Sequence, residues 1–555
     1  MSHKVTCFYY YDSQNKTKGS TIIGKNMKTP DMQLAAEAVE LAKIIVSKAI
    51  AEVAVAGIDA NQVTAYDLAH GASGVEAARS MLDYGAKGEI EAHLACAFIA
   101  DVLADLVTRV YGREENWGIT PADLNRAHSF IKDFRSPEFV ASLAKQQGPT
   151  HLDVDFELVQ DTFARFAREV IAPQADEIHR RNLDVPEEVI SGLGEIGAFG
   201  LSIPEEFGGF ASGSENDYLA MVVATEELSK ASLASGGSLI TRPEILARAL
   251  MRGGTKEQKE YWLPKLATGE TMAAVAVTEP DYGSDVASLS TTATRTDGGW
   301  ILNGVKTWCT FAARADVLMV LARTNPDRTL AHRGLSLFIV EKPRGDSEGW
   351  AFTQENPAGG VGKMEGRPID TVGYRGMHSY EIAIDNWFVP QSNLVGDEGG
   401  LGKGFYFQME GFENGRIQTA ARAIGLMQVA YEVALAYAEN RKVFGSPIYD
   451  YQLTQYKLGR MAYIIQAARQ FSYHVSALMA KGEGALEASM VKAYVCRAAE
   501  WVTREAMQIH GGMGYAEEYS VSRYFLDARV LSIFEGADET LSLKVIARKL
   551  IDSQS

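Results

Sequence analysis

The chain has 555 residues, of which 46% are hydrophobic and 23% are charged, and its formal net charge is −17. This composition is typical of a folded protein that is too long for one core, so we expect several domains. A strongly acidic surface repels phosphate backbones and anionic membranes, which disfavours nucleic acid and membranes as partners.

The cysteine pattern and the N-terminus bear on the compartment. Cys7, Cys96, Cys309 and Cys496 are not spaced as metal or redox pairs, which predicts a reducing environment, no disulfide framework and no metal site. The N-terminus lacks the apolar segment of a signal peptide, and no run of about 18 uncharged apolar residues occurs. We therefore expect a cytoplasmic protein.

Residues 1–148 are predicted to form a helical extension. After an irregular arm over residues 1–30, apolar residues recur every three or four positions from Asp31. Similar helical patterns follow near residues 64–83, 88–111 and 120–146. Pro121 and Asp123 are typical of a helix start, and no catalytic motif occurs in the extension.

The remaining chain alternates between helical and strand patterns. Helical periodicity continues after the GPTH segment at 148–151, and near residue 272 the period falls to two while β-branched residues increase. Strands are expected up to about residue 390, joined by Asp-Gly, Asn-Gly and Gly turns. After Gly404 the helical pattern returns, with three long helices. The predicted order is therefore a helical bundle, helices, strands and helices.

The segment VAVTEPDYGSD, residues 275–285, joins a strand to a loop. Gly283 and the small hydroxyl of Ser284 leave backbone N–H groups open, which suits a phosphate or a flat ring at the strand edge. An ordinary hairpin turn would explain the same residues.

The segment WILNGVKTWCT, residues 300–310, contains Asn303-Gly304, a hairpin signal. Trp308 and Thr310 alternate onto one face of the predicted strand, with Cys309 on the other face. A flat wall beside a hydrogen-bonding hydroxyl fits an isoalloxazine ring. The alternative is a Trp that only fills the core.

Three further motifs lie in the C-terminal part. Arg441 and Lys442 precede a Phe-Gly turn. A cation there can bind a pyrophosphate, and Phe444 can cover an adenine. The alternative is that the basic residues only complement the dipole at a helix C-terminus. QIHGGMGY, residues 508–515, ends a helix with two glycines, which permits close approach of a ligand or makes a simple turn. In FENGRIQTAARAIG, residues 412–425, Arg416 is expected at a helix start, with a surface salt bridge as the alternative.

Together with IFEGADET at 533–540, these stretches resemble the acyl-CoA dehydrogenase family in order and spacing, over about residues 152–552. The resemblance rests on TEPxxGSD, RxxFG, QxxGGxGY and the Glu-Gly pair near the C-terminus. It implies a mainly α fold with a central β domain, in which a helical domain, a β-barrel or β-sandwich domain and a C-terminal four-helix bundle follow one another. With the extension, the expected domains are residues 1–148, 149–270, 271–395 and 396–555.

The resemblance implies FAD as the cofactor, an acyl-CoA substrate and a homo-oligomer, because several FAD contacts in the family cross a subunit interface. The residues carried over as FAD contacts are Val275, Val277, Thr278, Ser284, Trp308, Thr310, Arg441, Phe444, Gln452, Gln508, Gly511, Gly512, Ala537 and Glu539. Those carried over to the substrate are Ser284, Glu413, Arg416 and Gly536. Ala537-Asp538-Glu539 stands where many members have Thr-Ser-Gln.

The resemblance assigns Glu535 as the catalytic base of an α,β-dehydrogenation. Glu535 would remove the α-proton while the β-hydrogen leaves as hydride to the flavin. A general base typically contributes about 10²–10⁴-fold in rate, so polarisation of the thioester carbonyl must contribute further. Some branches of the family place the base just before the arginine equivalent to Arg416, but Gly415 occupies that position here. An acid with a purely structural role at a helix start is the alternative.

The extension is similar to that of family members acting on (2S)-methylsuccinyl-CoA in the ethylmalonyl-CoA pathway. We therefore expect dehydrogenation of a short branched dicarboxylic acyl-CoA to mesaconyl-CoA, with electrons passed to electron-transferring flavoprotein. The free carboxylate of this substrate requires a cation, and Arg242 in SGGSLITRPEIL, residues 235–246, is the candidate. A surface position for Arg242, or a pair with Glu244, is the alternative.

Three other functions stay open at this point. They are another short-chain acyl-CoA dehydrogenase, an acyl-CoA oxidase that passes electrons to O₂, and a non-enzymatic DNA-binding relative. Oxidases are generally longer than this chain. A DNA-binding relative would need a basic C-terminal surface, which the net charge of −17 disfavours.

Overall fold

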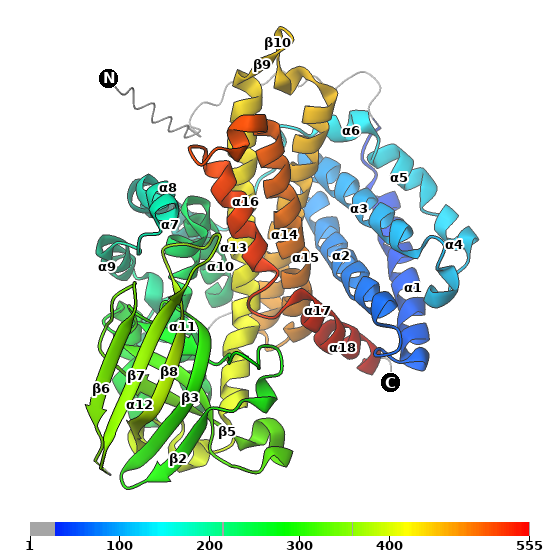
Figure 1. The fold of residues 1–555 in the computed structure, drawn as a ribbon. Coiled ribbons are helices and arrows are strands. Elements are labelled where there is room, and N and C mark those ends of the chain that lie inside the picture. The colour runs from blue at the N-terminus through cyan, green and yellow to red at the C-terminus, as the bar shows by residue number, and fades with distance from the viewer. Residues whose placement is uncertain (1–27, 214–215, 358, 554–555) are drawn as a thin grey trace, which may run out of the picture.

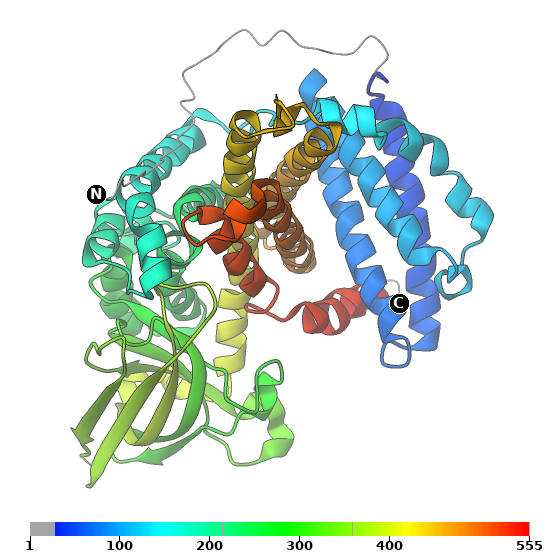
Figure 2. The same ribbon diagram turned by 45° about the horizontal axis from the view of Figure 1, so that its top comes forward.

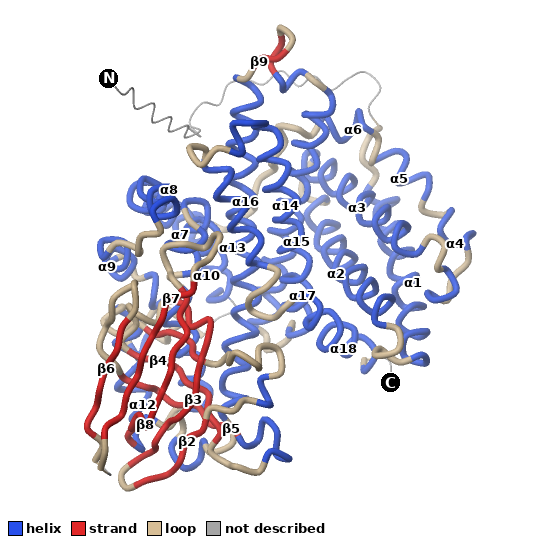
Figure 3. Tube along the Cα trace, in the orientation of Figure 1, coloured by secondary structure: helices blue, strands red, loops and turns tan. Residues whose placement is uncertain are grey.

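The computed structural model describes residues 28–213, 216–357 and 359–553, and it is mainly helical with one large sheet (Figures 1 and 3). The predicted mainly α fold with a central β domain is confirmed. Cys7 and nearly all of the irregular arm predicted over residues 1–30 lie outside the described residues. Among the described residues, no helix combines the length and apolar character needed to cross a membrane.

The N-terminal extension consists of three long helices followed by short ones. They are α1 (Met32–Ala56), α2 (Gln62–Gly85), α3 (Glu89–Val110), η1 (Glu114–Trp117), α4 (Pro121–Asn125), α5 (His128–Phe134) and α6 (Pro137–Ser142). The Asp31 carboxylate caps α1 by accepting from two backbone N–H groups. The helical pattern expected over 120–146 is divided into three short helices, and Ser136 caps the last of them at Pro137, which cannot continue a preceding helix.

The next helices run from residue 154 to residue 268. They are α7 (Val154–Phe166), η2 (Ala167–Ile171), α8 (Ala172–Arg181), α9 (Glu187–Glu195), η3 (Ala198–Gly200), η4 (Glu205–Phe207), α10 (Asn216–Ala231), η5 (Leu233–Ser238), α11 (Thr241–Gly253) and α12 (Lys256–Thr268). The small residues of η5 form a buried wide turn that leads directly into α11.

One eight-stranded sheet has the order β1-β4-β2-β3-β8-β7-β6, with β5 beside β4. Its strands are β1 (Ala273–Ala276), β2 (Thr292–Thr296), β3 (Gly299–Thr310), β4 (Val317–Arg323), β5 (Leu335–Glu341), β6 (Trp350–Glu355), β7 (Val361–Ile369) and β8 (Ser379–Pro390). The sheet is mostly antiparallel, but β4 pairs in parallel with β1 and β2. The sequence pattern did not indicate β6 or β7.

Asn303-Gly304 is not a hairpin turn, contrary to the expectation. It lies inside β3, where the register against β8 shifts between Leu302 and Gly304. A Cβ atom on Gly304 would lie 2.4 Å from the Thr291 hydroxyl oxygen, so the glycine permits a close approach of the chain. The reversal between β2 and β3 falls instead at Asp297-Gly298, where Gly298 has φ 77°.

The C-terminal part is dominated by four packed helices. Its elements are α13 (Gly404–Asn440), β9 (Lys442–Val443), β10 (Ser446–Pro447), η10 (Ile448–Asp450), α14 (Gln452–Ala480), α15 (Ala485–His510), η11 (Gly511–Tyr515), α16 (Ser520–Leu531), α17 (Asp538–Thr540), η12 (Leu541–Ile546) and α18 (Ala547–Asp552). These helices lie between the extension on one side and the sheet with α7–α12 on the other (Figures 1 and 2). Arg416 lies in the interior of α13, so its expected place at a helix start is wrong.

The extension approaches the bundle closely where α6 meets α14. A Cβ atom on Gly459 of α14 would lie 1.9 Å from the carbonyl oxygen of Val140, so only glycine fits there. Tyr431 of α13 donates to the carbonyl of Ala144 at 2.7 Å, just beyond α6. The first is a contact between two backbones and the second joins a side-chain hydroxyl to a backbone carbonyl, and together they fix the distance between the extension and the bundle.

Replacing Gly459 by alanine should weaken the docking of the extension. The added methyl would meet a backbone carbonyl, and we expect a loss of about 1–3 kcal/mol in the free energy of unfolding. This loss should appear in urea-induced unfolding even though alanine favours a helix over glycine by about 1 kcal/mol.

Gly74→Ala on α2 is the matched control. There the added methyl would meet only side chains, the nearest being Val102 at 3.4 Å, and we expect no loss of stability. Similar changes in the two variants would contradict the close backbone approach at Gly459.

Candidate active site

Glu535 lies in the turn that follows α16, and its backbone is left-handed with φ 53°. Such a conformation costs a non-glycine residue about 1–3 kcal/mol and is often found at functional sites. The turn is closed by a bond from the Asp538 N–H to the Ser532 carbonyl at 3.2 Å. Lys492 of α15 donates to the Gly536 carbonyl at 2.6 Å. The bond within the turn and the bond from α15 therefore both restrict the position of Glu535.

Helix α13 leaves room for the Glu535 carboxylate. A Cβ atom on Gly415 would lie 2.9 Å from Glu535 Oε2, so the carboxylate packs against a helix position without a side chain. The neighbouring Arg416 is buried and donates to the Ser489 hydroxyl of α15 at 3.1 Å. The predicted base and the predicted substrate arginine therefore come together at the contact between α13, α15 and the turn.

Arg422, which sequence reasoning missed, lies on α13 beside this turn. Its guanidinium is fully buried, stacks over the Phe534 ring at 5.0 Å and donates to the Ser238 hydroxyl at 3.0 Å. Burial lowers the pKa of Arg422, and the nearby Glu535 acts against this shift. An arginine inside the apolar run AARAIG was the signal that could have revealed it.

Arg242 is buried in the first turn of α11, so a surface position is excluded. It donates to the Ser238 carbonyl at 3.2 Å and to the Thr241 hydroxyl at 3.1 Å. Glu244 pairs with Arg248 at 3.2 Å instead, so the second alternative is wrong as well. Arg242 and Arg422 thus share Ser238 as an acceptor residue, and among the described residues neither forms an ion pair with a carboxylate.

The end of β3 presents a flat aromatic surface. Trp308 is 56% exposed and has φ 57°, whereas Cys309 is buried on the other side of the strand. The Thr310 hydroxyl lies 3.0 Å from the Ser379 hydroxyl. The carbonyl of the half-buried Thr278 accepts from the Thr307 N–H at 2.8 Å, which holds the TEP segment beside this strand end. Trp308 is therefore not a core residue.

A buried ion pair supports the TEP segment. Lys306 donates to Glu279 at 2.9 Å and to the Val277 carbonyl at 3.0 Å, and both side chains are almost fully buried. Burial alone would raise the pKa of Glu279, but Lys306 and bonds from Ser290 and Thr291 lower it to about 2. Burial lowers the pKa of Lys306. The charged pair and its hydrogen bonds fix the path of the loop.

The predicted residues around this loop are not equally accessible. Val277 is buried and Val275 is half-buried, whereas Ser284 is exposed. The Thr540 hydroxyl donates to the Ser284 hydroxyl at 3.1 Å, so the loop borders the Glu535 turn. Ala537 is half-buried and Glu539 is exposed. The side chain of Glu413 lies outside the described residues.

The other predicted FAD residues lie at the far end of the bundle. Arg441 follows the last residue of α13, and by the helical rise it lies about 38 Å from Arg416 along the axis. Phe444 is fully exposed with φ 49° in the small β9–β10 turn (Figure 1). Tyr437 stacks on His510 at 4.2 Å, which places the end of α15 near that of α13.

This second group is open to solvent. Its exposed members are Arg441, Phe444, Gln452, Gln508, Gly511 and Gly512. A Cβ atom on either glycine would have no neighbour within 4 Å. The predicted FAD residues of one chain therefore form two groups that are separated along the bundle. The described residues contain no cluster of side chains that could hold a metal ion.

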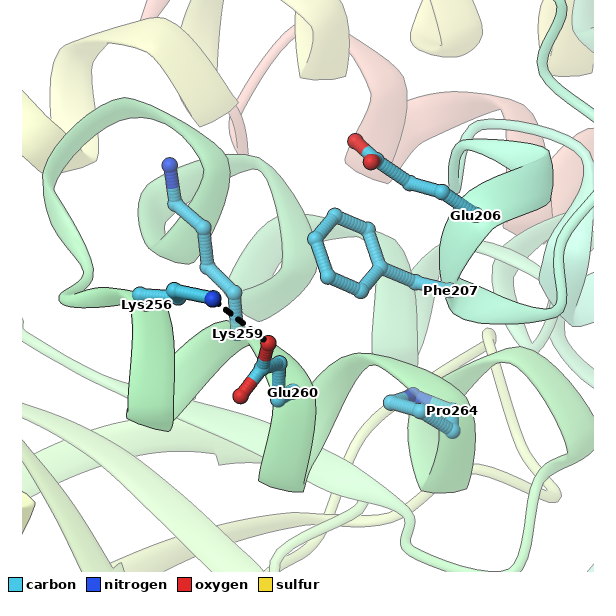
Figure 4. Close-up of a pocket in the computed structure, with 6 residues that line it drawn as sticks. All are labelled: Glu206, Phe207, Lys256, Lys259, Glu260 and Pro264. Atoms are coloured by element: carbon cyan, nitrogen blue, oxygen red, sulfur yellow. Dashed lines mark ion pairs between the residues drawn. The ribbon is translucent and has the colours of Figure 1, made fainter.

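A surface pocket beside α12 is separate from both groups (Figure 4). Its walls carry charges of both signs, and Lys256 pairs with Glu260 at 3.6 Å. It is lined by Glu206, Phe207, Lys256, Lys259, Glu260 and Pro264. Because no predicted site residue lines it, this pocket is not the candidate active site.

Three family models match consecutive parts of the chain. The acyl-CoA dehydrogenase N-terminal domain matches residues 154–270, the middle domain 274–387 and the C-terminal domain 402–551. The chain belongs to the acyl-CoA dehydrogenase family. Members of this family are FAD-dependent oxidoreductases that act on acyl-CoA substrates.

Several relatives cover the same part of this acyl-CoA dehydrogenase. The (2S)-methylsuccinyl-CoA dehydrogenase of Cereibacter sphaeroides is 46% identical over 406 residues, which is 73% of this chain and 71% of the relative. A solved glutaryl-CoA dehydrogenase in complex with glutaryl-CoA has a TM-score of 0.65 at 30% identity, covering 72% of this chain and 96% of that chain. A structure from work on the electron transferring flavoprotein of Acidaminococcus fermentans has a TM-score of 0.65 at 32% identity, covering 73% of this chain and 99% of that chain.

The buried pair under the TEP segment gives a testable prediction. Lys306→Met leaves Glu279 as a buried carboxylate without its cation, and we expect a loss of about 3–5 kcal/mol in the free energy of unfolding. The double variant Lys306→Met/Glu279→Gln should recover part of this loss, because it removes the unpaired charge. Thermal unfolding measures both; a double variant less stable than Lys306→Met would contradict the electrostatic explanation.

Proposed function

We propose that the protein catalyses the α,β-dehydrogenation of a short branched dicarboxylic acyl-CoA, with (2S)-methylsuccinyl-CoA as substrate and mesaconyl-CoA as product. The observation that carries the substrate class is the pair of buried guanidinium groups, Arg242 and Arg422, beside the Glu535 turn. The 46% identity to a (2S)-methylsuccinyl-CoA dehydrogenase supports the same choice.

Two buried guanidinium groups among neutral acceptors favour an anionic ligand. Burial of an unpaired charge costs several kcal/mol, and a carboxylate is the anion that a guanidinium binds in bidentate geometry. Arg242 and Arg422 both bond to Ser238, and Arg422 also stacks on Phe534, the residue before Glu535. A carboxylate on the short acyl chain would therefore be held close to the reacting carbons.

Glu535 is the proposed base. Its carboxylate would accept the α-proton, and Gly415 keeps the space around it free. The Glu535 N–H would donate to the thioester oxygen and so acidify the α-carbon. Bound FAD supplies the two-electron acceptor for the hydride from the β-carbon. Electron-transferring flavoprotein is the proposed acceptor of these electrons.

The residues present fit FAD if two copies of the chain form each site. Exposed Trp308 with the nearby Thr278 and Thr310 suits the flat ring system, and Ser284 lies at the edge of the Glu535 turn. Arg441 and Phe444 suit the pyrophosphate and adenine, but within one chain they lie too far along α13 for the same dinucleotide to reach both groups. We infer a homodimer in which each partner completes the other's site.

Glu535→Gln should abolish flavin reduction while FAD and substrate still bind. The amide cannot take the α-proton, so the rate of anaerobic flavin bleaching should fall by at least about 10²–10⁴-fold. Stopped-flow absorbance measures this rate. Glu517→Gln, a change at an exposed glutamate, is the control and should match the wild type. Bleaching of Glu535→Gln at near wild-type rate would remove Glu535 from the role of base.

Arg242→Met and Arg422→Met should discriminate between acyl-CoA substrates. Hydrogen bonds to charged groups contribute about 1.5–3 kcal/mol, so each variant should lose about 10–100-fold in kcat/KM for methylsuccinyl-CoA and little for butyryl-CoA. Arg181→Met is the control, because Arg181 is an exposed arginine of α8 that pairs with the exposed Glu177. Equal losses for both substrates in Arg242→Met and Arg422→Met would contradict a carboxylate-binding role.

A further inference from the structure

The N-terminal extension contacts the catalytic turn directly through α2. Tyr66 and His70 are one helical turn apart on α2, so they share a face. The Tyr66 hydroxyl lies 2.5 Å from Asp538 Oδ2, and His70 Nε2 lies 3.1 Å from the same oxygen. The two rings meet edge to face at 4.6 Å. The short C-terminal helices that follow the turn lie beside α2 (Figure 1).

This contact is buried and has defined donors. The side chains of His70 and Asp538 are only 4% and 11% exposed. An ionised carboxylate only accepts hydrogen bonds, so the Tyr66 hydroxyl and a His70 ring N–H must donate. Burial and the bond to Asp538 raise the pKa of Tyr66 to about 12, so this hydroxyl keeps its proton at neutral pH. Burial lowers the pKa of His70, which keeps the ring neutral.

Other groups around the contact are consistent with an ionised Asp538. The Arg497 guanidinium lies over the Tyr66 ring at 5.8 Å, and the Ser542 hydroxyl lies 3.3 Å from His70 Nε2. Burial alone would raise the pKa of Asp538, but the bonds from His70 and Tyr66 lower it.

Asp538 belongs to the turn that carries the proposed base. It follows Glu535 by three residues, and its N–H closes the turn onto Ser532. Helix α15 holds the same turn through Lys492 at the Gly536 carbonyl and through Glu500, which accepts from the Ser532 hydroxyl at 2.5 Å. The turn is therefore held by α15 on one side and by the extension on the other.

The geometry points to Tyr66 and His70 as positioning residues that hold Asp538 and thereby the orientation of Glu535. This inference rests on the proposed role of Glu535 as base. It also gives the extension a part in the reaction and explains the acid in Ala537-Asp538-Glu539, because a carboxylate at 538 matches the two donors of α2. Without these donors the buried carboxylate would move toward water and take the turn with it.

The test compares Tyr66→Phe and Tyr66→Phe/His70→Leu with the wild type as FAD-loaded enzymes. The rate of flavin reduction at saturating substrate should fall about 10-fold in the single variant and about 100-fold in the double, as expected for a misplaced catalytic group. FAD content should be unchanged and KM should change far less than kcat. Hydrogen–deuterium exchange in peptides covering residues 532–540 should become faster.

Tyr84→Phe is the matched control. It removes the hydroxyl of another buried tyrosine on α2, which donates to the Pro149 carbonyl at 3.1 Å and has no contact with Asp538. It should leave both the reduction rate and the exchange of residues 532–540 at wild-type values.

The outcomes separate this inference from the proposed function. A rate loss shared equally by Tyr84→Phe, or unchanged exchange of residues 532–540 in Tyr66→Phe, overturns the positioning role. If no acyl-CoA reduces the wild-type flavin, the proposed function fails, and the exchange measurement alone decides whether α2 orders the turn.

Discussion

The close packing of α13 against the Glu535 carboxylate is the constraint on which the site depends. A side chain at position 415 would occupy the space of that carboxylate, so the helix must present a glycine there. Thr419 and Arg422 follow at spacings of four and seven residues and therefore lie on the same face of α13. One helical face thus provides space for the proposed base, a hydroxyl that accepts from Arg422, and a buried cation.

The buried arginines of this protein differ in the partners that they contact. Arg469 of α14 makes two bonds to one oxygen of Glu226 of α10, at 3.0 and 2.7 Å, and this permanent ion pair joins the bundle to the adjacent helical layer. Arg422 and Arg242 have only neutral acceptors among the described residues. Glu535 is the carboxylate that acts on Arg422 from nearby, without an ion pair, so the proposed substrate carboxylate would add a direct partner for a costly buried cation.

Much of the architecture follows from local pattern, and the errors follow from contacts that local pattern does not contain. Buried residues recur every three or four positions in a helix and every second position in a strand, so periodicity distinguishes the two. It predicted the correct order of helical and β regions. Asn303-Gly304 looks like a turn, but the close approach of Thr291 requires the glycine inside a strand. Arg416 follows an Asn-Gly pair that suggests a boundary, yet packing keeps α13 continuous through it.

Candidate site residues could be named from the sequence where a short motif carries the proposed chemistry. The Glu-Gly pair and the TEPxxGSD loop are local, so Glu535 and Ser284 could be named from the sequence, and the structure places them on bordering loops. Arg422 was missed because an arginine in an apolar run has no local signature of its role. Tyr66 and His70 could not be linked to Asp538, since only the tertiary fold brings them together.

The bond between Tyr66 and Asp538 spans 472 positions of the chain and has a consequence for biosynthesis. Tyr66 leaves the ribosome long before Asp538 does. Domains generally fold in the order in which they are made, and contacts of long sequence separation form late because loop closure must come first. The face of α2 that carries Tyr66 and His70 can therefore form this contact only after Asp538 has been made. The turn that carries Glu535 therefore gains its contact with α2 late in folding.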